Sequence, residues 1–88
     1  MENTNSTQIA FITRWEETAS RFRQEAVTFA SAPGVRKAAL AACGHATRLV
    51  QAARANPSLT GGPLCKALRA ALVAKQAVAE AAGEALAG

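Results

Sequence analysis

Apolar residues recur at alternating steps of three and four from residue 12 to residue 29, which leaves few folds open to the chain. The series is Ile12, Trp15, Ala19, Phe22, Ala26 and Phe29. Because an α-helix completes a turn in 3.6 residues, this spacing gathers the apolar side chains on one face. We therefore expect a helix over about residues 6 to 31, with Asn5 as its N-cap and Gln8 at the capping-box position.

Proline and glycine interrupt the chain at residues 31 to 34 and again at residues 56 to 63. Neither segment fits a helix interior, because proline lacks an amide hydrogen and glycine weakens the helix. After the first break we expect a helix over residues 34 to 55, with Ser31 as its cap and Pro33 in its first turn. It has a second apolar series with the same spacing, formed by Val35, Ala39, Ala42, Ala46, Leu49 and Ala53.

A third helix is expected over residues 63 to 86, capped by Thr60 or Gly62. Helices that follow one another through short connections pack antiparallel. The sequence thus predicts an all-α, three-helix antiparallel bundle, with a disordered polar tail at residues 1 to 5 and a single helical domain at residues 6 to 88. The expected neighbours across the bundle are Trp15 with Leu49 and Val50, Phe22 with Cys43, Leu64 with Ala53, and Leu72 with Ala46.

Alanine makes the core of this bundle thin. Half of the 88 residues are hydrophobic, but alanine adds little apolar area while it favours helix. Gly44, in the middle of the second helix, costs about 1 kcal/mol relative to alanine, so we expect it to mark a close contact with a neighbouring backbone. A bundle with so little bulk gains stability by pairing, and we expect a homodimer or a tight complex with another protein.

Positive charge is unopposed in the middle of the chain. The net charge is +4, and no acidic residue occurs between Ala26 and Ala79, where seven positive residues lie. Such a block favours an anionic partner, either an acidic protein surface or nucleic acid, or it serves as a solvated surface. We assign partner binding to these basic residues and to two apolar residues expected among them: Arg36, Lys37, Leu40, Arg48, Arg54, Lys66, Arg69, Val73 and Lys75.

Three of these residues do not fit a simple amphipathic pattern. Leu40 falls within a basic arc of the second helix, and Val73 falls on the charged side of the third. An exposed apolar residue rimmed by charge is typical of an interface, although single exposed hydrophobic residues are also ordinary. Lys75 falls near the middle of the apolar face of the third helix, so its side chain either extends to solvent or meets an acidic group of a partner.

No arrangement of residues in the sequence predicts catalysis, a cofactor or a metal. Cys43, Cys65 and the single His45 do not follow a zinc-binding spacing. Both cysteines are expected as free thiols, since the antiparallel register separates them by ten helical residues, about 15 Å. His45 is expected at a boundary of the second helix, and it has no partner at the spacing of a catalytic triad.

The N-terminus gives no sign of export. Its first seven residues are polar, and no run of 18 apolar residues occurs. We therefore expect a cytoplasmic protein that does not contact membranes. The leading hypothesis for its function is a small non-catalytic interaction module, that is, an adaptor, inhibitor or accessory subunit. The alternative is nucleic-acid binding by residues 36 to 75, which lacks the interleaved aromatic residues used for base stacking.

Overall fold

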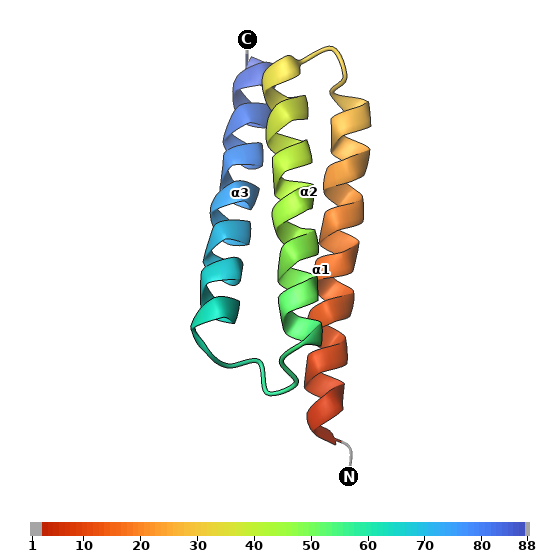
Figure 1. Cartoon of the computed structure of the whole chain (residues 1–88). Helices are drawn as coiled ribbons and strands as arrows, with labels where there is room; N and C mark the ends of the chain where they lie inside the picture. The colour runs from red at the N-terminus through yellow and green to blue at the C-terminus, as the bar shows by residue number, and fades with distance from the viewer. Residues whose placement is uncertain (1–2, 88) are drawn as a thin grey trace.

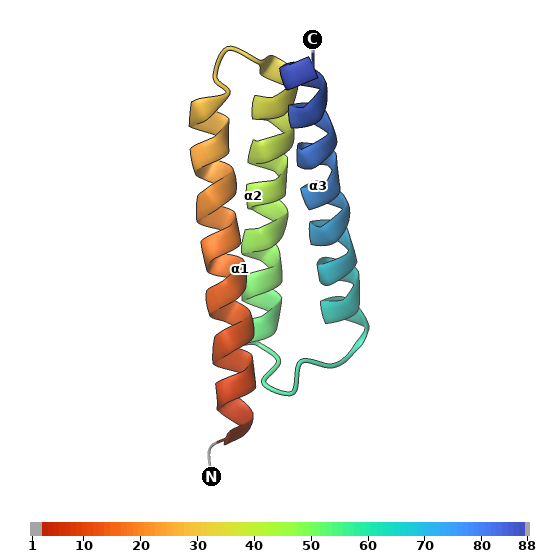
Figure 2. The same cartoon turned by 180° about the vertical axis from the view of Figure 1, so that it is seen from behind.

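The chain forms three helices: α1 (Asn3–Thr28), α2 (Pro33–Arg54) and α3 (Gly62–Ala87). The computed structural model describes the backbone of residues 3 to 87 and the side chains of residues 6 to 87. The helices run antiparallel in sequence order, and α2 lies between α1 and α3 (Figures 1 and 2). The all-α three-helix bundle predicted from the spacing of apolar residues is confirmed.

The helix boundaries lie within three residues of the predicted ones, but the predicted caps differ. Helix α1 already begins at Asn3, so Asn5 lies in its first turn, and residues 1 and 2 of the predicted tail lie outside the described residues. Ala32, not Ser31, caps α2 and makes no side-chain hydrogen bond to it. Pro33 occupies the first helical position as predicted, where its missing amide hydrogen costs nothing.

Helix α3 begins at Gly62, one residue earlier than predicted. Gly61 occupies the position directly before the helix. Gly61 has a φ of 103°, and its carbonyl accepts a backbone hydrogen bond from Cys65 at 3.1 Å. Only glycine adopts this conformation without steric cost. Neither predicted cap, Thr60 or Gly62, therefore occupies the position before the helix. The preceding turn is organised by Asn56, whose Nδ2 donates to the carbonyl of Thr60 and whose Oδ1 accepts from Ser58 Oγ at 3.1 Å.

The core consists of two clusters along α2. The first joins Trp15 of α1 to Leu49 and Val50 of α2 and to Leu64 of α3, as the predicted register requires. The second joins Phe22 and Ala26 of α1 to α2 and to Val78 of α3, with Cys43 packed against it. All six residues of the predicted seam of α2 are buried, but Leu49 and Val35 are the largest fully buried side chains. Alanine fills much of the rest, so the core is thin.

Helix α3 is rotated relative to the prediction. Leu72 was expected against Ala46, but its side chain is 48% exposed, and Ala71 lies in the core instead. The buried residues Leu64, Ala71 and Val78 follow steps of seven, which places the neighbouring Leu72 about 100° away from the core face. The expected Leu72–Ala46 contact is therefore wrong.

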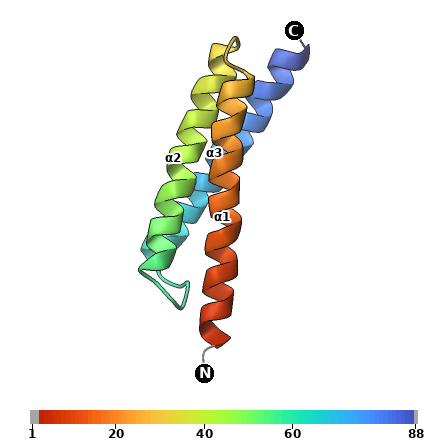
Figure 3. The same cartoon turned by 90° about the vertical axis from the view of Figure 1, so that its right-hand side faces the viewer.

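Helix α2 holds the other two together. In the described part of the chain, no Cα atom of α1 lies within 8 Å of a Cα atom of α3, and α3 is inclined to the α1–α2 pair (Figure 3). Helix α1 is also attached to the end of α2 by Gln8, whose Nε2 donates to the carbonyl of Ala53 at 2.9 Å. The same carbonyl also accepts a backbone hydrogen bond from Asn56 at 3.1 Å, so Gln8 adds a second bond at the C-terminal end of α2. Gln8 thus links two helices instead of completing a capping box.

Leu49 is the residue on which the first cluster depends. We expect Leu49→Ala to lower the free energy of unfolding by about 2 to 5 kcal/mol, because it removes buried methyl groups and leaves a cavity. Leu40→Ala on the same helix serves as control, and we expect a loss of less than about 1 kcal/mol because Leu40 is 47% exposed. Urea denaturation followed by circular dichroism measures both. Equal losses would contradict the assigned core.

Gly44 is not at a close approach of two backbones, which corrects the expectation from the sequence. A Cβ atom built at Gly44 would meet no atom within 4 Å, because the residue faces away from the buried seam of α2. We expect Gly44→Ala to raise the free energy of unfolding by about 1 kcal/mol. Gly61→Ala should lower it, since its φ of 103° strains any side chain. Thermal melts of both variants test this, and a destabilised Gly44→Ala would refute it.

Candidate protein-binding groove

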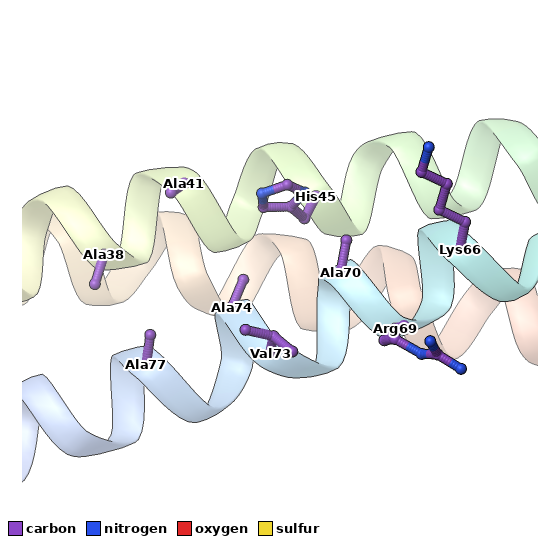
Figure 4. Close-up of a pocket in the computed structure, with 9 residues that line it drawn as sticks. All are labelled: Ala38, Ala41, His45, Lys66, Arg69, Ala70, Val73, Ala74 and Ala77. Atoms are coloured by element: carbon purple, nitrogen blue, oxygen red, sulfur yellow. The ribbon is translucent and has the colours of Figure 1, made fainter.

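An open groove of about 520 Å³ runs between α2 and α3. We call it the α2/α3 groove. Five alanines and one valine form most of its lining, together with three basic or polar side chains (Figure 4). The lining residues are Ala38, Ala41 and His45 of α2 and Lys66, Arg69, Ala70, Val73, Ala74 and Ala77 of α3. Such an apolar groove with a few polar groups at its rim is typical of a binding site.

The groove exists because both helices present alanine where they approach each other. Ala38 and Ala74 pack against the second core cluster and form part of the base of the groove. Their methyl groups are too small to fill the space above the line of contact between the helices. Val73 stands at the edge, with 65% of its surface exposed. The result is a shallow apolar surface that a larger side chain at these positions would close.

One end of the groove is basic. A second hollow of about 340 Å³ continues it, lined by His45, Arg48 and Lys66 together with Pro63, Ala67 and Ala70. The guanidinium of Arg48 lies 3.3 Å from His45 Nδ1. Since arginine can only donate, the ring nitrogen of His45 is the acceptor in this contact. His45 thus contacts Arg48 in the hollow that Lys66 also lines.

Beyond the other end of the groove, a separate hollow of about 310 Å³ between α2 and α3 contains a glutamate. Glu84 lies there with Ala81 and Ala85 of α3, against Pro33 and Gly34 of α2. One turn earlier on α3, Glu80 accepts a hydrogen bond from Gln76 Nε2 at 3.3 Å. The surface along α3 therefore changes from positive charge near its N-terminus, through alanine and valine, to negative charge near its C-terminus.

The residues assigned to partner binding from the sequence do not form one surface. Lys66, Arg69 and Val73 line the groove, and Arg48 lies at its basic end. The others are exposed but lie elsewhere: Arg36, Lys37 and Leu40 on α2, Arg54 beside Glu16 of α1, and Lys75 in a hollow between α1 and α3.

The positions of two of these residues are explained by their surroundings within the chain. Arg54 forms an ion pair with Glu16, which links α2 to α1 on the side away from the groove. Lys75 is exposed beside Arg21 and Glu25 of α1. It leaves the apolar face of α3 for solvent, as one of the two interpretations of the sequence expected.

Nothing in the sequence singles out the alanines of the groove or the position of His45 in it. Charge and isolated large hydrophobic residues drew attention to other positions, whereas alanine is common on every side of these helices. One signal was present in the spacing. Lys66, Ala70, Val73, Ala77, Glu80 and Glu84 follow steps of four and three, which places them along one face of α3, away from its buried residues. We call this series the outer stripe of α3.

Further findings concern the chemistry and relatives of the chain. Among residues 3 to 87 no group of three His, Cys, Asp or Glu side chains is placed to hold a metal ion. Cys43 is half-buried and Cys65 exposed, and both are free thiols. In the same part of the chain, no helix has an apolar stretch long enough to cross a membrane.

Comparison with protein-family models, curated proteins and solved structures gives no match.

Proposed function

We propose that this chain is a small non-catalytic protein-interaction module, an adaptor, inhibitor or accessory subunit, that binds a helix of a protein partner in the α2/α3 groove. The observation that carries the proposal is the groove itself, an open apolar surface lined mainly by alanine. Amphipathic helices bind in grooves of this kind by placing their apolar face against the lining. Small lining residues allow the helix axes to approach to about 8 Å.

The positive charges at the basic end of the groove indicate which charge the partner carries. Arg48, Lys66 and Arg69 are exposed there, and His45 is half-buried among them. Charges at the rim of an interface accelerate association and select partners of opposite sign more than they add affinity. The partner helix should accordingly carry acidic side chains near the end that lies over these residues.

The thin core also supports the proposal, because binding of a partner would stabilise the folded chain. The largest fully buried side chains are one leucine and one valine, and a partner that binds the folded state adds stability by mass action.

We place the module in the cytoplasm, a proposal that the two free thiols support because reduced cysteines are usual there.

Nucleic-acid binding is the alternative, and it has less support. The basic residues are distributed over several faces of the bundle, with Arg54 paired to Glu16 and Lys75 between α1 and α3. Trp15 and Phe22 are buried and so unable to stack on bases. We expect no retardation of single- or double-stranded DNA or RNA in gel-shift assays at low salt. Retardation that Lys66→Glu removes and added salt weakens would favour the alternative.

Site-specific photo-crosslinking in the native host tests the proposed function. A photoreactive phenylalanine analogue replaces Ala41 or Val73 in the groove, or Ser20 on the opposite side between α1 and α2. We expect a defined protein adduct from both groove positions and none from Ser20, because only the groove is covered by a partner. Adducts from Ser20 alone, or from none of the three positions, would contradict the proposal.

A further inference from the structure

The outer stripe of α3 is complementary to a reversed copy of itself. Its six residues form three pairs that are equally distant from residue 75: Lys66 and Glu84, Ala70 and Glu80, and Val73 and Ala77. When two copies of α3 run antiparallel about this point, each residue of the stripe faces its counterpart in the other copy. Every favourable pair is then formed twice, as a twofold axis requires.

We propose that a second copy of this chain occupies the α2/α3 groove, with the two α3 helices antiparallel and residues 66, 70 and 73 of one copy opposite residues 84, 80 and 77 of the other. This inference rests on the proposed function, since it names the partner of the same groove. Lys66, at the basic end of each copy, meets Glu84 of the other copy.

The charges determine the direction of the two helices. In the antiparallel arrangement Glu80 and Glu84 of one copy lie over the basic end of the other, where His45, Arg48 and Lys66 gather. In a parallel arrangement Lys66 would face Lys66 and Glu84 would face Glu84. Like charges facing each other across an interface disfavour that arrangement.

The size and shape of the surface suit a helix of the same chain. The outer stripe extends over 19 residues, and its two ends are about 27 Å apart along the helix. Its middle is apolar, with Val73 exposed beside Ala70 and Ala77. A second α3, parallel to α2, rests against Ala38 and Ala41 as well. Two α2 helices and two α3 helices then enclose the alanines that the single chain leaves open, in the manner of a four-helix bundle.

Charge exchange on the full-length chain tests this arrangement. Sedimentation velocity at micromolar concentration should give a dimer for the unmodified chain. Lys66→Glu and Glu84→Lys should each weaken dimerisation by about tenfold or more, because each places like charges opposite each other. The double variant K66E/E84K should dimerise more tightly than either single variant, because the 66–84 pairs are re-formed with their signs exchanged. Lys66 and Glu84 are both exposed, so we expect the variants to fold. Circular dichroism verifies that their helices are intact.

A matched pair of valine substitutions tests the apolar centre. Val73 and Val27 have the same exposed fraction, 65%, but Val27 lies on α1, away from the stripe. Val73→Glu should yield a monomer and Val27→Glu a dimer. A monomeric unmodified chain, or a dimer that Lys66→Glu, Glu84→Lys and Val73→Glu leave intact, would overturn the inference. A monomer whose groove still crosslinks to another protein would overturn the inference and keep the proposed function, whereas a monomer without groove adducts would end both.

Discussion

Close packing of alanine along α2 is the constraint from which the other features of this bundle follow. Ala39, Ala42, Ala46 and Ala53 are almost completely buried between the neighbouring helices. Their small side chains allow the backbones to approach closely but remove little apolar surface from water. The stability that alanine does not supply must come from a few larger residues, chiefly Trp15, Phe22 and Leu49. A second set of alanines, which flanks this buried row, leaves the space between α2 and α3 unfilled above the line of contact: Ala38, Ala41, Ala70, Ala74 and Ala77.

Periodicity predicted the helices well because it depends on local geometry. The series on α1 and α2 contain Trp15, Phe22 and Leu49, and these large residues mark the core face without ambiguity. On α3 the pattern is weaker, because leucine, valine and alanine occur around most of the helix. Leu72 was therefore expected in the core, where the structure has Ala71. The helix caps could not be predicted from the sequence either, because they depend on the path of the connecting segments. The positive φ of Gly61 is an example.

The candidate site was only partly predictable for a related reason. Lys66, Arg69 and Val73 were identified by their charge or by their conflict with the amphipathic pattern. A groove, however, depends on how two helices are rotated against each other, and neither helix alone contains that information. Arg54 shows that charge alone does not locate a partner surface, because its guanidinium forms an ion pair with Glu16 of α1 within the chain.

The central position of α2 has a consequence for how the bundle comes apart. Helix α1 buries a tryptophan and a phenylalanine and is fastened to the end of α2 by Gln8, whereas α3 buries only Leu64, Ala71 and Val78. Since α3 has no backbone approach to α1 in the described part of the chain, its detachment leaves the α1–α2 hairpin in place. We therefore expect α3 to open at the lowest free energy, so a partner that covered its outer side would protect the fold where it is weakest.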